Sequence, residues 1–248
     1  MNSLNQKIKI ATILPYKENY TYSNAQAAAI WVCDFFKYSI YNKDNFIFGN
    51  TQGKDYLTNN YINIPIHFKK SKFKSTTREY CRNFIKKVKN ENFEIIEIHN
   101  RPQIWNILNK EIKTKFILYF HNDPLNMKGS KTLSERLNLL NNVDKIIFVS
   151  KWTQNRFFKD LDKKLIDKTE VIYPSIHKSK KIHKKNKNIV FVGKLNQSKG
   201  YDIYKDAIIK VLNEYKNCKP HKPLSCYFNQ RTFINSLPRH KCVCSQCN

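Results

Sequence analysis

The sequence is poor in glycine, in acidic side chains and in long apolar runs. Only 5 of its 248 residues are glycine, and the first of them is Gly49. A glycine-rich phosphate loop in the first 48 residues is therefore excluded. No stretch reaches the roughly 18 consecutive apolar residues of a membrane span, and no apolar leader segment follows Met1. These absences predict a cytoplasmic protein.

Basic side chains outnumber acidic ones by 45 to 19, which gives a net charge of +26. Of the basic residues, 38 are lysine and only 7 are arginine, whereas base and phosphate recognition relies on arginine forks. We therefore expect no specific nucleic-acid partner, although a basic nucleic-acid-binding protein stays open as the alternative. Attraction to anionic phospholipid head groups is expected, with peripheral contact at the inner face of the membrane.

Extended and helical hydrophobic patterns alternate through the first 175 residues. Repeated strand–helix units of this kind predict an α/β fold with a doubly wound parallel sheet. Ser23 or Asn24 is expected to cap the first helix. The predicted strands cover residues 8–14, 45–48, 62–66, 93–98, 115–120, 145–149 and 170–173, and the predicted helices cover 24–38, 75–90, 102–113, 131–141 and 152–165.

Polar residues follow two of these strands directly. His99, Asn100 and Arg101 end one strand, and His121, Asn122 and Asp123 end the next. In doubly wound sheets ligands bind beyond the carboxyl ends of the strands, so the two groups are expected to lie side by side in a cleft. A neutral histidine there can hydrogen-bond a hydroxyl group, and Arg101 can pair with a phosphate or acidic ligand.

A second site is indicated by residues 189–200, which read IVFVGKLNQSKG. An apolar β-branched run stops at Gly193, Lys194 and Lys199 follow, and Gly200 opens an amphipathic helix. A strand, a glycine turn, two cations and a helix start favour an anion, because free backbone N–H groups and the helix dipole both attract negative charge. The alternative is an ordinary strand-to-helix turn with two solvated lysines.

The order Gly-basic-Leu-x-x-x-Lys-Gly resembles the donor-phosphate loop of family 4 glycosyltransferases, which have the GT-B fold. The resemblance runs from about residue 7 to residue 216 and extends to the HNRP and HNDPLNMKGSKTLSER segments. It implies two Rossmann-like domains, a nucleotide-sugar donor, a glycan or lipid-linked acceptor, and retention of anomeric configuration. Under it His121 is catalytic, and Gly193, Lys194 and Lys199 bind the donor phosphates. The acceptor-side residues are His99, Asn100, Arg101, Asn122 and Asp123.

The resemblance also divides the chain. Residues 1–176 correspond to an acceptor-side domain, 177–188 to a lysine-rich linker and 189–216 to the first βα unit of a donor domain. The family's glutamate pair, spaced E-x7-E, is absent after residue 216. We therefore expect this chain to have negligible transferase activity. No metal or other cofactor is implied, since the nucleotide-sugar is a substrate.

The last segment, 217–248, has a different composition from the rest. It contains five of the seven cysteines and no acidic residue. Its HKCVCSQC cluster allows a zinc site, because thiolates and imidazole are preferred zinc ligands. The other interpretation, which we favour, is a disordered or out-of-frame tail. A nucleotide-binding or interaction domain that uses this zinc-like tail is the second alternative function.

Overall fold

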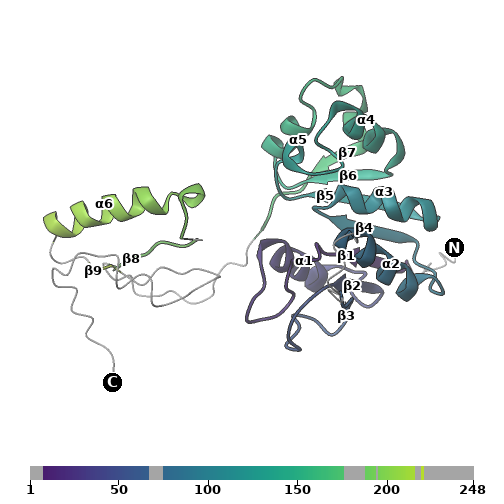
Figure 1. The fold of residues 1–248 in the computed structure, drawn as a ribbon, viewed down its shortest axis with the longest axis horizontal. Helices are drawn as coiled ribbons and strands as arrows, with labels where there is room; N and C mark the ends of the chain where they lie inside the picture. The colour runs from purple at the N-terminus through teal and green to yellow at the C-terminus, as the bar shows by residue number, and fades with distance from the viewer. Residues whose placement is uncertain (1–7, 67–74, 176–187, 194, 216–218, 221–248) are drawn as a thin grey trace, which may run out of the picture. The chain divides into compact units, whose positions relative to one another are not determined.

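The computed structural model describes residues 8–66, 75–175, 188–193, 195–215 and 219–220, and the chain divides into two compact units, 1–177 and 178–248. The first unit is built on a seven-stranded parallel sheet with the strand order β3-β2-β1-β4-β5-β6-β7 (Figure 1). The predicted α/β class with a doubly wound parallel sheet is confirmed.

The elements of the first unit follow the predicted order, and all but one lie within a few residues of their predicted bounds. Its strands are β1 (Ile10–Ile13), β2 (Asn45–Gly49), β3 (Tyr61–Asn63), β4 (Ile95–His99), β5 (Lys115–Phe120), β6 (Lys145–Phe148) and β7 (Thr169–Val171). Its helices are α1 (Ala27–Tyr38), α2 (Thr76–Val88), α3 (Pro102–Glu111), α4 (Leu133–Asn142) and α5 (Lys151–Phe157), with 3-10 turns η1 (Pro124–Asn126) and η2 (Lys163–Lys168).

Helices cover the sheet from both sides and create two apolar cores. Helices α2 to α5 pack on one face, and α1 packs on the other (Figure 1). Because side chains alternate along a strand, Ile96 and Ile98 of β4 enter the core beneath α2 and α3. Glu97 and His99 therefore point to the face that α1 covers. This alternation brings the polar residues of β4 to one side of the sheet.

The start of α1 differs from the prediction that Ser23 or Asn24 caps it. The helix begins at Ala27, and its N-cap residue, Gln26, makes no side-chain capping bond. Instead, the buried Glu18 accepts a hydrogen bond of 3.1 Å from the backbone N–H of Ala29. A carboxylate from the loop after β1 thus already occupies the positive end of the helix dipole. That arrangement disfavours a phosphate at the start of α1.

The predicted helix over residues 152–165 is also wrong in its length. Helix α5 ends at Phe157, and Asp160 adopts a left-handed backbone with φ +62°. A right-handed helix cannot continue through such a residue. Phe157 and Phe158 are buried, so the apolar pattern that suggested a longer helix reflects packing into the core.

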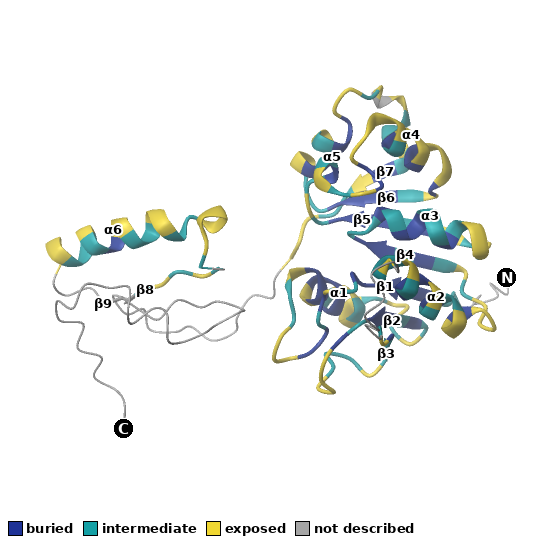
Figure 2. Ribbon diagram, in the orientation of Figure 1, coloured by how far each residue is buried: buried dark blue, intermediate teal, exposed yellow. Residues whose placement is uncertain are grey.

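The second unit contains β8 (Asn188–Ile189), the turn η3 (Gln197–Lys199), α6 (Tyr201–Glu214) and β9 (Lys219–Pro220), which pairs in parallel with β8. The expected βα unit is present, but the strand is shorter than the predicted apolar run. Most of α6 is intermediate or exposed (Figure 2). Only Ile208 of this helix is buried, and Ile203 is 71% exposed. Of the helices in the described ranges, none has the length and apolar character needed to cross a bilayer.

The tight approach of Gly129 to α3 gives a stability prediction. Gly129 has φ +97°, and an added Cβ would lie 2.6 Å from the backbone nitrogen of Gln103. We expect Gly129→Ala to lower the free energy of unfolding by about 3 kcal/mol, through the left-handed backbone and a clash that only backbone movement relieves. Urea denaturation measures this loss.

A matched control is Gly53→Ala. Gly53 has φ +99°, but its nearest atoms belong to the side chains of Asp55 and Thr21 at 3.3 Å and 3.6 Å. This variant should lose only about 1 kcal/mol, the cost of the backbone conformation. Equal losses in the two variants would contradict the steric explanation.

Candidate functional site

The candidate site lies where the strand order changes direction. From β1 the chain proceeds to β2 on one side, and from β4 it proceeds to β5 on the other, although β1 and β4 are neighbours. The loops that follow β1 and β4 therefore separate at the carboxyl edge of the sheet. In open parallel sheets the crevice at such a switch point is the usual ligand site.

Two histidines meet at this edge. His99 is the last residue of β4, and His121 follows β5, the neighbouring strand. Their rings are joined by a hydrogen bond of 2.8 Å between Nδ1 of His99 and Nε2 of His121. The adjacency predicted from the parallel sheet is confirmed. The contact occupies Nε2 of His121 and leaves its Nδ1 as the ring nitrogen for a ligand.

Burial keeps both imidazoles neutral. Desolvation lowers the pKa of His121 from its ordinary value of 6.5 to about 4. The pKa of His99, which is 1% exposed, lies well below its ordinary range because of burial first and the neighbouring His121 second. In a hydrogen bond between two neutral imidazoles one ring donates and the other accepts, so the second nitrogen of each ring has the opposite role. Nδ1 of His121 therefore accepts a hydrogen bond in one tautomer and donates one in the other, without carrying charge.

Aromatic side chains surround the pair. Trp31 of α1 meets His121 edge-on, with ring centroids 5.1 Å apart and planes at 89°, and it also contacts His99. Tyr119 stacks flat on His99 at 4.4 Å with an interplanar angle of 6°. These contacts fix the orientation of both rings. Trp31 and Tyr119 are themselves buried, so they position the imidazoles from within the core.

A carboxylate supports this layer from inside the sheet. Glu97 accepts hydrogen bonds from the Tyr119 hydroxyl at 2.9 Å and from the Thr12 hydroxyl at 2.6 Å. Burial raises the pKa of Glu97, while both hydrogen bonds oppose that rise. Glu97 thus anchors Tyr119, and Tyr119 in turn stacks on His99.

Asn100 connects the loops after β4 and β5. Its backbone has φ +55°, a left-handed conformation that asparagine tolerates better than most residues. Its side-chain oxygen accepts hydrogen bonds from the backbone N–H groups of His121 at 2.8 Å and Asn122 at 3.2 Å. Asn100 therefore fixes the backbone from which His121 projects, and its side-chain oxygen is engaged in doing so.

Two further acceptor-side candidates, Asp123 and Asn122, have different roles in the structure. Asp123 forms an ion pair of 2.8 Å with Arg156 of α5 and accepts a bond from the backbone N–H of Leu125. The pKa of Asp123 is lowered, first by the hydrogen bond from Arg156. Its carboxylate is thus engaged in holding α5 and η1. Asn122 is exposed, and its backbone contributes the bond to Asn100.

In the second unit, the turn around Gly193 is described except for Lys194, which lies outside the described residues. An added Cβ at Gly193 would lie 3.7 Å from Cβ of Lys199, so the turn brings these two positions together. The N–H groups of Lys199 and Gly200 donate to carbonyls of Asn196 and Gln197. Fewer backbone N–H groups are therefore free to bind an anion than the sequence suggested. Anion binding at this turn would depend more on the charge of Lys199.

Sequence reasoning missed the residues that shape the histidine pair: Trp31, Glu97 and Tyr119. A signal for two of them was present: Glu97 lies two residues before His99 on β4, and Tyr119 of β5 lies two residues before His121, which follows the strand. Polar residues two apart in an otherwise apolar strand share one face. Trp31 had no comparable signal, since its position depends on how α1 crosses the sheet.

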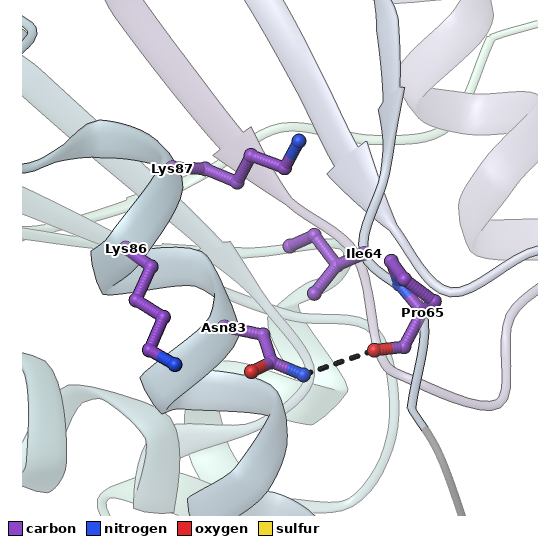
Figure 3. Close-up of a pocket in the computed structure, with 5 residues that line it drawn as sticks. All are labelled: Ile64, Pro65, Asn83, Lys86 and Lys87. Atoms are coloured by element: carbon purple, nitrogen blue, oxygen red, sulfur yellow. Dashed lines mark hydrogen bonds between the residues drawn. The ribbon is translucent and has the colours of Figure 1, made fainter.

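A pocket of about 380 Å³ lies elsewhere in the first unit. It is formed by Ile64 and Pro65, after β3, and by Asn83, Lys86 and Lys87 of α2 (Figure 3). None of the candidate residues lines it. Within the described part of the chain, no group of three or more His, Cys, Asp or Glu side chains is arranged to hold a metal ion, and the cysteines of the 217–248 tail lie outside that part.

Comparison with known proteins shows the fold. No family model and no curated protein matches the sequence. Similar solved structures include HepE from Anabaena, crystallised with UDP-glucose, at a TM-score of 0.60 and 11% identity over 92% of this chain. A glycosyltransferase from Rickettsia africae gives 0.54 and 12% over 88%, and sucrose-phosphate synthase from Thermosynechococcus elongatus gives 0.52 and 9% over 88%.

The chain spans 64% of the length of HepE, 69% of the Rickettsia protein and 71% of the synthase. At these identities the likeness establishes a shared GT-B type of architecture with a Rossmann-like parallel sheet. The Rickettsia protein is described as a glycosyltransferase, and HepE has also been crystallised with UDP.

The neutral histidine pair predicts a pH dependence of stability. Because the pKa of His121 is about 4 in the folded chain and near 6.5 when unfolded, the unfolded chain binds the extra proton first as pH falls. Stability should therefore fall from pH 6.5 to about 4, by at most about 3 kcal/mol from this residue.

His121→Asn removes this titration. Urea denaturation at pH 7.0, 5.5 and 4.5 should give a smaller decrease for the variant than for the native chain. The difference between the two isolates His121 from carboxylates that titrate in the same range. Parallel pH curves for the two proteins would refute a depressed pKa.

Proposed function

We propose that the first unit is the acceptor-side domain of a glycosyltransferase that moves a sugar from a nucleotide-sugar to a glycan or a lipid-linked acceptor. The observation that carries this proposal is the neutral His121, held by His99 and Asn100 against Trp31 at the switch point of the sheet. This arrangement offers one directed hydrogen bond from an imidazole that a buried aromatic layer holds in place. Such a group suits a sugar hydroxyl.

Group transfer in this proposal breaks the bond between the anomeric carbon and the diphosphate oxygen. A new bond forms to an acceptor oxygen, and the acceptor hydroxyl proton passes to the oxygen of the departing diphosphate. Anomeric configuration is retained. His121 orients the sugar through Nδ1, because its Nε2 is occupied by His99. Arg101 lies on the acceptor side with His99 and Asn100, while Asn122 and Asp123 keep the intervening loop in place.

The donor diphosphate belongs to the turn of the second unit. Gly193, Lys194 and Lys199 bind it, and the two lysines stabilise the negative charge of the leaving group. The likeness to HepE, which was crystallised with UDP-glucose, supports a nucleotide-sugar donor. Residues 1–176 form the acceptor domain, 177–188 the linker and 189–216 the beginning of the donor domain. The enzyme acts in the cytoplasm, with peripheral contact to anionic membrane.

A binding experiment tests the sugar site. Saturation-transfer NMR with methyl α-glucopyranoside should show weak binding to the purified chain. His121→Gln should reduce that transfer severalfold, since it removes a directed hydrogen bond worth about 1 kcal/mol. Lys128→Ala, an exposed change in the same loop, is the control. Equal transfer in native and His121→Gln proteins would overturn the role of His121.

The second test concerns turnover. Purified 248-residue chain incubated with UDP-glucose and an acceptor mixture should release UDP no faster than a boiled control. The reason is that the donor side of this chain lacks the E-x7-E glutamate pair. Release of UDP above the control, if lost on Lys199→Gln, would contradict the expected inactivity.

A further inference from the structure

The arginines of the first unit differ sharply in what they bind. Arg136 donates to the carbonyls of Lys131 and Lys159, and Arg156 donates to both carboxylate oxygens of Asp123. Arg78 and Arg82 are exposed on α2, where water solvates them. Arg101 belongs to neither class. It is half-buried, and among the described residues no carboxylate or carbonyl accepts a bond from it.

The lack of a partner has a cost. The Nε atom of Arg101 is buried without a hydrogen-bond acceptor. Leaving a buried donor unpaired costs about 1–3 kcal/mol, and more for a charged group. Nε of Arg136 is also buried without an acceptor, but both terminal nitrogens of Arg136 donate to backbone carbonyls. No side-chain nitrogen of Arg101 has an acceptor among the described residues. A ligand that accepts bonds from the Arg101 guanidinium would offset that cost.

Arg101 lies against a tyrosine from the other side of the switch point. Its Cζ is 5.4 Å from the ring centroid of Tyr16, in the loop after β1. Nζ of Lys17 lies 6.0 Å from the same centroid. Two cations from two different loops thus share one aromatic ring, at the edge of the sheet where His99 also ends β4.

The ring that joins the cations is held firmly. The backbone carbonyl of Tyr16 accepts a bond of 3.0 Å from Asn50, and its ring packs on Tyr80 at 6.2 Å. Tyr80 is buried and donates its hydroxyl proton to the carbonyl of Leu14 at 2.8 Å. The platform is therefore anchored to β1 and α2 before any ligand arrives.

We propose that Arg101, Tyr16 and Lys17 form a binding site for a phosphate or diphosphate group carried by the acceptor. A phosphate monoester carries a charge of about −1.5 to −2 at neutral pH. The two cations, which have no acidic partner among the described residues, match this charge better than the single charge of a carboxylate. The guanidinium fork fits phosphate oxygens in a bidentate manner. That the phosphate belongs to an acceptor rests on the proposed function, whereas the anion site itself does not.

The test follows the Nε–H signals of the seven arginines in chain labelled with ¹⁵N-arginine, during titration with inorganic pyrophosphate. The Arg101 signal, assigned by its loss in Arg101→Lys, should shift and saturate. The signal of the exposed Arg82 should not, which separates this site from attraction to net charge and from the turn near Lys199. Lys17→Gln should weaken the binding about fivefold. Lys110→Gln, an equal charge change at the far end of α3, should leave it unchanged.

Further probes distinguish the source of the phosphate. Tighter binding of glucose 1-phosphate than pyrophosphate indicates a free sugar phosphate, and tighter binding of farnesyl diphosphate indicates a lipid-linked acceptor. No saturable shift of Arg101, or an equal shift with acetate, would overturn the proposal. A shift of Arg101 together with unchanged sugar binding in His121→Gln would leave the anion site standing and remove the transferase assignment.

Discussion

The parallel direction of all seven strands is the constraint on which the candidate site depends. Because every strand ends at the same edge, residues that follow β1, β4 and β5 meet although they lie up to about a hundred positions apart in the sequence. The register between β4 and β5 pairs His99 with Tyr119, which places His121 just beyond the edge and within a hydrogen bond of His99. A shift of one residue would turn the histidines to opposite faces of the sheet.

Burial then determines the chemistry of this edge. Two histidines in contact with Trp31 and Tyr119 lose the water that would stabilise an imidazolium, so the pair stays neutral and serves hydrogen bonding better than charge neutralisation. The positive charge at this edge comes from Arg101, after β4, and from Lys17, in the loop after β1. The separation of a neutral hydrogen-bonding group from a cationic one is what a ligand with a sugar and an anionic group would require.

Local sequence patterns predicted most of the first unit and failed where contacts are long-range. Alternation and apolar periodicity placed every strand, and the adjacency of His99 and His121 followed from parallel strand ends. The capping of α1 by Glu18 was not predictable, because it joins residues 11 apart through a folded loop. The end of α5 depends on Asp160 adopting a left-handed backbone, which no local pattern required. Whether a polar residue has a partner also depends on packing: Asp123 has one, and Arg101 has none within the described ranges.

The contrast between Asp123 and Arg101 shows how hydrogen-bond partners distinguish residues that hold the structure from residues that can bind a ligand. Asn100, Asp123 and Arg156 are polar residues near the site whose bonds end within the protein, so their effect is to hold loops in position. Nδ1 of His121 and the guanidinium of Arg101 are polar groups at the same edge whose bonding capacity is unused within the described residues. Buried polar groups are usually satisfied, because an unpaired one costs free energy of the order of a whole hydrogen bond. Unused hydrogen-bonding capacity at this rigid, partly buried edge of the sheet therefore indicates a ligand that supplies the missing bonds.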